Sequence, residues 1–322
     1  TVTDGDSGAD VRATTFTATI AGGFGATGGG DNSIDTTVTN LNVDTTSNGA
    51  DGHQWIDEAN GLATLNLNAG SGNITLNSGG TVTDGDSDAD VRATTFTATI
   101  AGVFGAVGGG DNSIDTSVTN LNVDTTSNGA DGSQWIDEAD GLATLNLNAG
   151  SGNITLNSGG TVTDGDANAD IRATTFTGTI EGAFGATGGG DNRIDTMVTN
   201  LNVDTTSNGA DGSQWIDEAD GLATLNLNAG SGNITLNSGG AVTDGDANAD
   251  VRATTFTATI AGAFGAMGGG DNSINTTVTN LNVDTTSNGA NGHQWIDEAD
   301  GLATLNLNAG SGNITLNSGG TV

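Results

Sequence analysis

The amino-acid sequence predicts an all-β protein, a right-handed parallel β-helix or β-solenoid. Three observations predict this fold class. An 80-residue unit recurs four times along the 322 residues, its apolar side chains alternate with polar ones, and clusters of Gly, Asn, Asp and Ser separate the alternating stretches. Alternation with period 2 indicates strands with one buried face. Because one unit cannot bury its apolar face alone, recurring units of this kind stack on one another.

The repeats divide the chain without remainder except at its end. The segment GLATLNLNAGSGNITLNSGG is identical in every copy, which is typical of a part made to be stacked. We therefore expect one continuous solenoid, either a slice of a longer array or the repeating segment of a fibre. The four copies and the start of a fifth are residues 1–80, 81–160, 161–240, 241–320 and 321–322.

The strands follow one another in the same order in each repeat. In residues 14–22, Phe16, Ala18 and Ile20 share one parity, and residues 33–46, 62–68 and 73–77 alternate in the same way. Thr, Val and Ile are enriched in these segments, as pleated surfaces prefer. About nine short strands per repeat predict three strands per coil, about three coils per repeat and roughly 27 residues per coil. Four smaller coils of about 20 residues are the alternative.

Charge and composition exclude several classes of protein. The net charge is −34, with 5 Lys plus Arg against 39 Asp plus Glu. Nucleic-acid binding requires a basic surface, and anionic membranes are disfavoured for the same reason. No segment approaches the ~18 consecutive apolar residues of a membrane span, so we expect no membrane insertion. The chain contains no Cys, which removes disulfides and thiolate metal sites. The expected small partner is a cation.

The acidic segment VTDGDSDAD, residues 82–90, is the sharpest candidate for a metal site. Asp84, Asp86, Asp88 and Asp90 alternate, and a D-x-D-x-[DN] run offers the oxygen ligands that Ca²⁺ prefers. The run departs from an EF-hand loop, because Ala follows where Gly is required and position twelve is Thr. A solvated acidic turn between coils is the alternative.

The same acidic segment occurs once in each repeat. Arg12 follows it in repeat 1 and recurs in every copy, which predicts a structural ion pair with the neighbouring Asp10. No cofactor is required by the sequence, and Ca²⁺ is the candidate ligand. The candidate metal ligands are Asp4, Asp6 and Asp10, then Asp84, Asp86, Asp88 and Asp90, then Asp164, Asp166 and Asp170, then Asp244, Asp246 and Asp250.

The segment QWIDEA contains the Trp residues of the chain. In a strand, Trp55 and Ile56 face opposite sides, and Ile56 suits an aliphatic core. Trp55 is then predicted to lie on the surface, in a contact stripe that stacks on sugars or on a neighbouring fibre. The alternative is a Trp covered by the loop at 45–52. The stripe consists of Trp55, Trp135, Trp215 and Trp295.

The sequence offers no catalytic constellation. Asp57 and Glu58 are adjacent in a strand and therefore diverge, which disfavours a paired acid–base role. His53 and His293 are replaced by Ser133 and Ser213 in the other repeats, so we expect surface loop positions there. We predict that the chain is not an enzyme. A polysaccharide-cleaving β-helix would need a cleft that is not repeated.

The order of motifs resembles a known family of repeats. GLATLNLNAGSGNITLNSGGTVTDGD is followed by ADVRATTFTATIAGGFGATG, SIDTTVTNLNVDTT and WIDEANG. This order resembles the haemagglutinin-type β-helix repeats of large secreted bacterial exoproteins, the filamentous haemagglutinin-like adhesins, through essentially the whole chain. The resemblance implies extracellular export, a right-handed β-helical shaft and roles in adhesion or biofilm structure. These motifs mostly encode the fold, so the resemblance implies no receptor.

These observations together predict an extracellular or cell-surface structural and adhesive shaft that forms a long fibre or stalk on bacteria or in biofilm matrix. The expected partners are further copies of the same repeats, end to end or in a longer chain, and polysaccharide of a host surface or matrix. The alternative is a secreted Ca²⁺-dependent repeat module that folds on binding calcium outside the cell.

Overall fold

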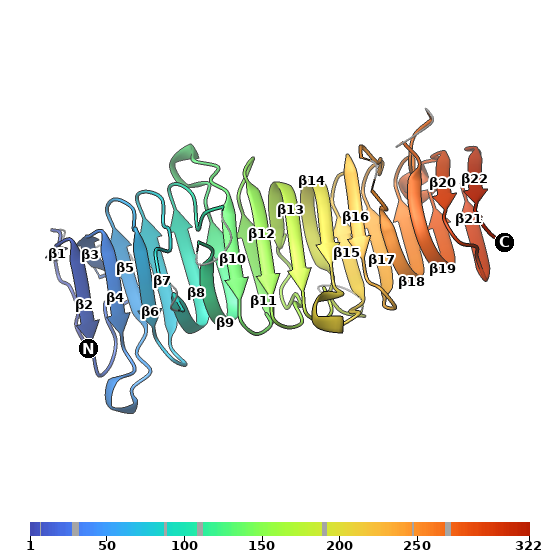
Figure 1. Ribbon diagram of the computed structural model, residues 1–322. Helices are drawn as coiled ribbons and strands as arrows, with labels where there is room; N and C mark the ends of the chain where they lie inside the picture. The colour runs from blue at the N-terminus through green and yellow to red at the C-terminus, as the bar shows by residue number, and fades with distance from the viewer. Residues whose placement is uncertain are drawn as a thin grey trace. The chain divides into compact units, whose positions relative to one another are not determined.

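The computed structural model describes residues 1–6, 8–27, 32–86, 89–107, 112–188, 192–246, 248–267 and 272–322. Asp88 lies outside the described residues. The chain forms two compact units, Thr1–Asn157 and Ser158–Val322. Each unit is a parallel β-solenoid whose neighbouring strands run in the same direction (Figure 1). Over the described residues the two units together contain about 12 turns of about 24 residues. No helix in the described part of the chain has the length and hydrophobicity that crossing a membrane requires.

Unit 1 consists of twelve described strands and two single-turn 3₁₀ helices. The last residue of its final strand belongs to unit 2. The elements are β1 (Val11–Arg12), β2 (Thr15–Thr19), β3 (Ile34–Thr37), β4 (Asn40–Asp44), η1 (Ser47–Gly49), β5 (Gln54–Glu58), β6 (Thr64–Asn68), β7 (Asn73–Ser78), β8 (Val91–Ile100), β9 (Ile114–Asp124), η2 (Ser127–Gly129), β10 (Gln134–Glu138), β11 (Thr144–Asn148) and β12 (Asn153–Ser158).

Unit 2 repeats the same order of elements in ten described strands. They are β13 (Ile171–Ile180), β14 (Ile194–Asp204), η3 (Ser207–Gly209), β15 (Gln214–Glu218), β16 (Thr224–Asn228), β17 (Asn233–Ser238), β18 (Val251–Ile260), β19 (Ile274–Asp284), η4 (Ser287–Gly289), β20 (Gln294–Glu298), β21 (Thr304–Asn308) and β22 (Ile314–Ser318).

Each strand pairs with the strand one coil further along, as the sequence predicts. The number of residues between paired positions sets the coil length. It is 20 from Gln54 to Ile74, 22 from Ile34 to Ile56 and 24 from Leu41 to Leu65. The expected 27 residues per coil is therefore wrong. The error arises because the estimate divided the whole repeat, protruding turns included, among three equal coils.

The long strands β8 and β9 each pass from one face of the solenoid to the next. In β8 the buried residues change parity, from Val91 and Ala93 to Phe96 and Ala98, across Thr94 and Thr95. The two halves pair with different short strands, β6 at the start and β7 at the end. The expected nine short strands are wrong for this reason: repeat 2 has five described strands, two of which each continue through a corner.

The core is built from ladders of apolar side chains, one rung per coil. In unit 1, Ile74 pairs with Phe96, Phe96 with Leu121 and Leu121 with Leu145, and all four are fully buried. Burying such a side chain stabilises the fold by about 1.5–3 kcal/mol. Because every repeat supplies the same rungs, the core continues through each unit without a change in composition.

Glycine is required where the chain turns between Phe104 and the following strand. Gly105 has φ +79°, a left-handed conformation that favours glycine. A Cβ atom there would also collide with the carbonyl oxygen of Trp135 in the next coil. The turn therefore fixes how closely two consecutive coils approach each other.

Candidate functional site

The acidic turns lie between a buried bridge residue and the first residue of a long strand. In repeat 2, Val82 is fully buried and forms parallel bridges with Leu62 and Phe104 on either side. Asp84 and Asp90 follow, and they are only 5% and 1% exposed. The prediction of a solvated turn is therefore wrong for these two side chains, because the coils on both sides cover them.

Each buried carboxylate is fixed by one of its two oxygens. Asp84 Oδ1 accepts a hydrogen bond from the Asp86 backbone N–H at 3.0 Å. Asp90 Oδ2 accepts one from the backbone N–H of Asp115, in the next coil, at 2.7 Å. The other oxygens, Asp84 Oδ2 and Asp90 Oδ1, are buried and have no hydrogen-bond partner. Such atoms carry a full desolvation cost unless a proton or a cation joins them.

The electrostatics of the pair follow from this burial. Loss of solvent raises the pKa of Asp90 to about 9, the Asp115 N–H opposes the rise, and the charge of Asp84 adds to it. Desolvation likewise raises the pKa of Asp170 to about 9 and that of Asp250 to about 8. Without a cation, the buried pair therefore holds a proton near neutral pH.

A third acid joins the pair in two of the repeats. One oxygen from each of Asp84, Asp86 and Asp90 lies within 4.8 Å of the others, and the same is true of Asp244, Asp246 and Asp250. In repeat 3, Asp164 and Asp170 are buried in the same way, but Asp166 does not complete such a group among the described residues. Asp88 falls outside the described residues, so its predicted role is not described by the structure.

Repeat 1 differs from the other repeats at this turn. Asp6 and Asp10 are exposed and Asp4 is half-buried, since no described coil precedes them. Asp10 Oδ2 nevertheless accepts a hydrogen bond from the Asp35 backbone N–H at 2.8 Å. The bond to the following coil is thus common to repeats 1 and 2, whereas the burial is not.

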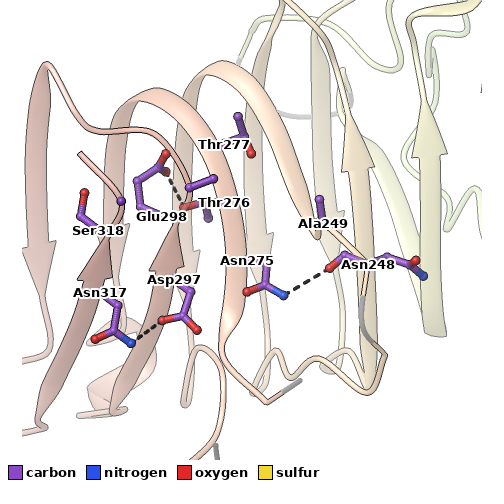
Figure 2. Close-up of a pocket in the computed structure, with 11 residues that line it drawn as sticks. Asn248, Ala249, Asn275, Thr276, Thr277, Asp297, Glu298, Asn317 and Ser318 are labelled. Atoms are coloured by element: carbon purple, nitrogen blue, oxygen red, sulfur yellow. Dashed lines mark hydrogen bonds between the residues drawn. The ribbon is translucent and has the colours of Figure 1, made fainter. Parts of the chain in front are cut away.

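A polar groove lies beside the acidic turn. In repeat 4 it has a volume of about 530 Å³ and is lined by residues of the turn and of β19, β20 and β22. Figure 2 shows Asn248 and Ala249 on one side and Asn317 with Asp297 on the other. The corresponding residues of repeat 1, including Ala9 and Asp57, line a groove of about 470 Å³.

The groove is polar, but its buried acid is already satisfied. Glu298 Oε2 accepts a hydrogen bond from Thr276 Oγ1 at 2.6 Å, shown dashed in Figure 2, and its Oε1 accepts one from the Asp300 N–H at 3.2 Å. Asn317 Nδ2 donates to Asp297 Oδ1 at 2.5 Å. A carboxylate held by several donors is a structural group, so the lining offers binding contacts of amide and hydroxyl type.

The Trp side chains face outward, as predicted. In β5 the residues Gln54, Ile56 and Glu58 are buried, whereas Trp55 and Asp57 on the opposite parity are half-buried. The neighbour of Trp55 on the next strand is Thr75, so no second Trp lies beside it. Each Trp therefore forms an isolated rung once per repeat, and whether it contacts a ligand stays a prediction.

Sequence reasoning missed the structural role of Gln54. This fully buried side chain donates through Nε2 to the carbonyl oxygens of Val43 at 3.1 Å and Asn68 at 3.0 Å. It thereby joins the ends of β4 and β6. Its position two residues before Ile56, on the buried parity of the strand, is the signal that could have identified it.

The His and Ser alternatives are also explained by the structure. His53 Nδ1 accepts a hydrogen bond from the Asn73 backbone N–H at 2.8 Å. Ser133 Oγ accepts the equivalent bond from Asn153 at 3.0 Å. Both side chains supply one acceptor to the following coil, which accounts for their exchange between repeats.

The expected ion pair between Arg12 and Asp10 is not formed. All five Arg residues are described, and the salt bridge that the described residues contain joins Arg193 to Asp217 at 2.9 Å. Arg92 is exposed and does not neutralise the buried aspartates next to it in sequence. The acidic turn therefore has no cationic side chain within ion-pair distance of Asp84 or Asp90.

The fold and the repeated turns define the chain as a tandem-repeat β-solenoid protein. No protein-family model, curated protein or solved structure matches the chain. The parallel solenoid that the haemagglutinin-type resemblance implies is confirmed, whereas membership of that family is not.

Proposed function

We propose that the chain is an extracellular structural shaft, a segment of a long fibre or stalk at a bacterial surface or in biofilm matrix. The observation that carries the proposal is the constant register where one repeat meets the next. Within unit 1, residues 73–78 pair with residues 95–100. Within unit 2, residues 233–238 pair with residues 255–260 in the same way. Repeats that add in one register lengthen a shaft without altering its surface.

Self-association follows from the same register. In unit 2, β21 and β22 have the sequences of β6 and β7, and Leu305 and Ile314 are 40% and 42% exposed there. A following coil with the sequence of β8, in the same chain or in another copy, would cover them as β8 covers β6 and β7. An open strand edge of this kind favours pairing. Further copies of the repeat are therefore the first partner that we propose.

Adhesion and location are the finer parts of the proposal. The resemblance to secreted exoproteins supports export, and the polar groove beside Asp297 supports weak contacts with a polysaccharide. The repeated surface and the satisfied Glu298 support a role without catalysis. Surface labelling of intact cells of the source organism tests the location, and protein found only inside the cells would contradict it.

The shaft itself is tested by changing its length. Proteins with two, four and six repeats would be examined by small-angle scattering. A solenoid with strands 4.7–4.9 Å apart and about 24 residues per coil should lengthen by roughly 16 Å per repeat at constant cross-section. A cross-section that grows with the number of repeats would contradict a shaft.

A Ca²⁺-dependent module is the second candidate function. The buried pair of Asp84 and Asp90 favours it, because two facing carboxylates oppose folding unless a proton or cation joins them. This candidate expects the β-sheet circular dichroism signal to collapse in excess chelator and to return with calcium. The plain shaft expects the signal to survive.

A further inference from the structure

The strongest unexplained feature of the molecule is a set of buried oxygens without partners. Asp84 and Asp90 are both more than nine-tenths buried, and each directs one oxygen that has no donor into the same turn. The described structure places no Arg within ion-pair distance of them. An isolated carboxylate in such surroundings is costly, and a pair of them is more so. The arrangement therefore lacks a positive group.

The position of the third acid supplies a route for that group. Asp86 is exposed, while an oxygen of its carboxylate lies within 4.8 Å of those of Asp84 and Asp90. A cation could enter from the solvent side and keep water ligands there. Oxygens bound to one Ca²⁺ at 2.3–2.6 Å can be at most about 4.6–5.2 Å apart, whereas those on one Mg²⁺ can be at most about 4.2 Å apart. The observed spacing suits the larger ion.

We propose that Asp84, Asp86 and Asp90, and likewise Asp244, Asp246 and Asp250, each bind one Ca²⁺ that fastens the acidic turn to the adjacent coil. Asp90 Oδ2 already holds the Asp115 N–H of the next coil, and Asp250 Oδ2 holds that of Asn275 at 2.6 Å. A cation on the remaining oxygen ties the turn to the same aspartate. This site goes beyond the shaft function and does not require that folding depend on calcium.

The proposal distinguishes among the four repeats. Repeats 2 and 4 bring three carboxylates together, so they form the tighter sites. Repeat 3 has the buried pair of Asp164 and Asp170 with one unpartnered oxygen each, so it binds more weakly. In repeat 1, Asp10 is exposed, and the site is incomplete without a preceding coil. The affinity should therefore follow burial and ligand number, although the acidic residues are nearly the same.

The test is calcium titration of the intact chain by isothermal calorimetry at pH 7.4. The protein is first stripped with chelator, and about 150 mM NaCl suppresses the diffuse attraction of the net charge. We expect a saturable phase of about two ions per chain and a rise in Tm on adding calcium. An absence of saturable binding, or a Tm that calcium does not change, would overturn the proposal.

Variants assign the binding to these residues. Asp90→Asn with Asp250→Asn should abolish the saturable phase. The control, Asp131→Asn with Asp211→Asn, changes the charge equally, at a position where repeat 4 naturally has Asn291, and should bind as the parent chain does. Equal binding by both double variants would overturn the proposal.

A second pair of variants guards against a folding defect. Asp86 and Asp246 are the least buried ligands of their sites, so Asp86→Asn with Asp246→Asn should retain the circular dichroism spectrum. We expect its affinity for Ca²⁺ to fall by at least about tenfold, because ligand charge tunes such sites. An unchanged affinity would overturn the proposal. Loss of β-structure in chelator would bear on the Ca²⁺-dependent folding function, which is a separate question from this binding.

Discussion

Repeats 1 and 2 carry nearly the same sequence but differ in burial. Val2 is 45% exposed, whereas Val82, its equivalent, is fully buried. Val2 bridges only to Phe24, on the following coil, whereas Val82 bridges to Leu62 as well as to Phe104. Asp10 and Asp90 differ in the same sense. The comparison shows that the environment of a side chain in this fold depends on the preceding coil as well as on its own repeat.

Contacts made with the following coil are the same in both repeats. The backbone N–H of Asp35 binds Asp10 at 2.8 Å, and that of Asp115 binds Asp90 at 2.7 Å. Gly25 and Gly105 both have φ +79°. Substitutions should therefore separate into those that act equally in the two repeats and those that act only where both neighbours are present.

The largest effect is expected at the conserved turn shape. Gly25→Ala and Gly105→Ala should each lower the free energy of unfolding by about 2–6 kcal/mol, from backbone strain together with the collision against the Trp of the next coil. Urea unfolding followed by Trp fluorescence measures this. Gly129→Ala is the control, because Gly129 also has a positive φ but open space around a Cβ, and its cost should be about 1–3 kcal/mol.

The next effect should differ between the repeats. Phe96→Ala should cost about 3–5 kcal/mol, since the side chain is fully buried and leaves a cavity. Phe16 is only half-buried, so Phe16→Ala should cost about 1–2 kcal/mol. Urea unfolding of the two variants compares them. Equal costs would mean that the preceding coil does not determine burial.

The third effect concerns protonation of the acidic turn in excess chelator. The pKa of Asp90 is raised to about 9 from the ordinary 3.8, so the folded chain keeps a proton that the unfolded chain releases above about pH 4. The stability that the protonated group contributes is therefore present below pH 4 and is lost as the pH rises to about 9.

Asp90→Asn keeps an acceptor for the Asp115 N–H and offers an amide donor to Asp84. We expect it to raise the free energy of unfolding by about 1–3 kcal/mol at pH 8 and to have little effect at pH 4. Asp10→Asn, at the exposed equivalent, should change it by less than about 0.5 kcal/mol. Thermal melts at both pH values provide the measurement, and an equal response of the two variants would contradict the comparison.

The smallest effects should come from the acceptor that links neighbouring coils. Ser133→His, which introduces the side chain that repeat 1 has as His53, should change the free energy of unfolding by less than about 0.5 kcal/mol. Ser133→Ala removes the acceptor of the Asn153 N–H and should cost about 0.5–1.5 kcal/mol. Hydrogen exchange at Asn153 measures both variants. Equal protection in the two would show that the bond is not needed.

Much of the fold was readable from the sequence. The period of 80 residues and the alternation at Phe16, Ala18 and Ile20 fix the strands and their buried faces. The change of parity between Val38 and Leu41 was also visible, and it marks the corner where β9-type strands turn to the next face. The coil length was not readable, because the sequence does not say which residues of a turn belong to the coil and which protrude from it.

The candidate site was only partly readable. The alternating aspartates predicted oxygen ligands, and the structure brings Asp84, Asp86 and Asp90 together. Their burial was not predicted, since a run of Asp reads as solvated until the coils that cover it are placed. The Arg was misjudged for a related reason. Adjacency in sequence puts Asp90 and Arg92 near each other along the chain, but burial of one and exposure of the other separate their charges.

The sequence by itself determined that this protein stacks identical units, that each unit is made of strands, and which parity of each strand faces inward. These properties are local, because period and alternation act within a few residues. Only the tertiary structure decided which carboxylates lose their water, which oxygens remain without partners, and that Asp10 and Asp90 have different surroundings. Burial is supplied by coils that are 20–25 residues away, and the sequence of one turn carries no record of what will cover it.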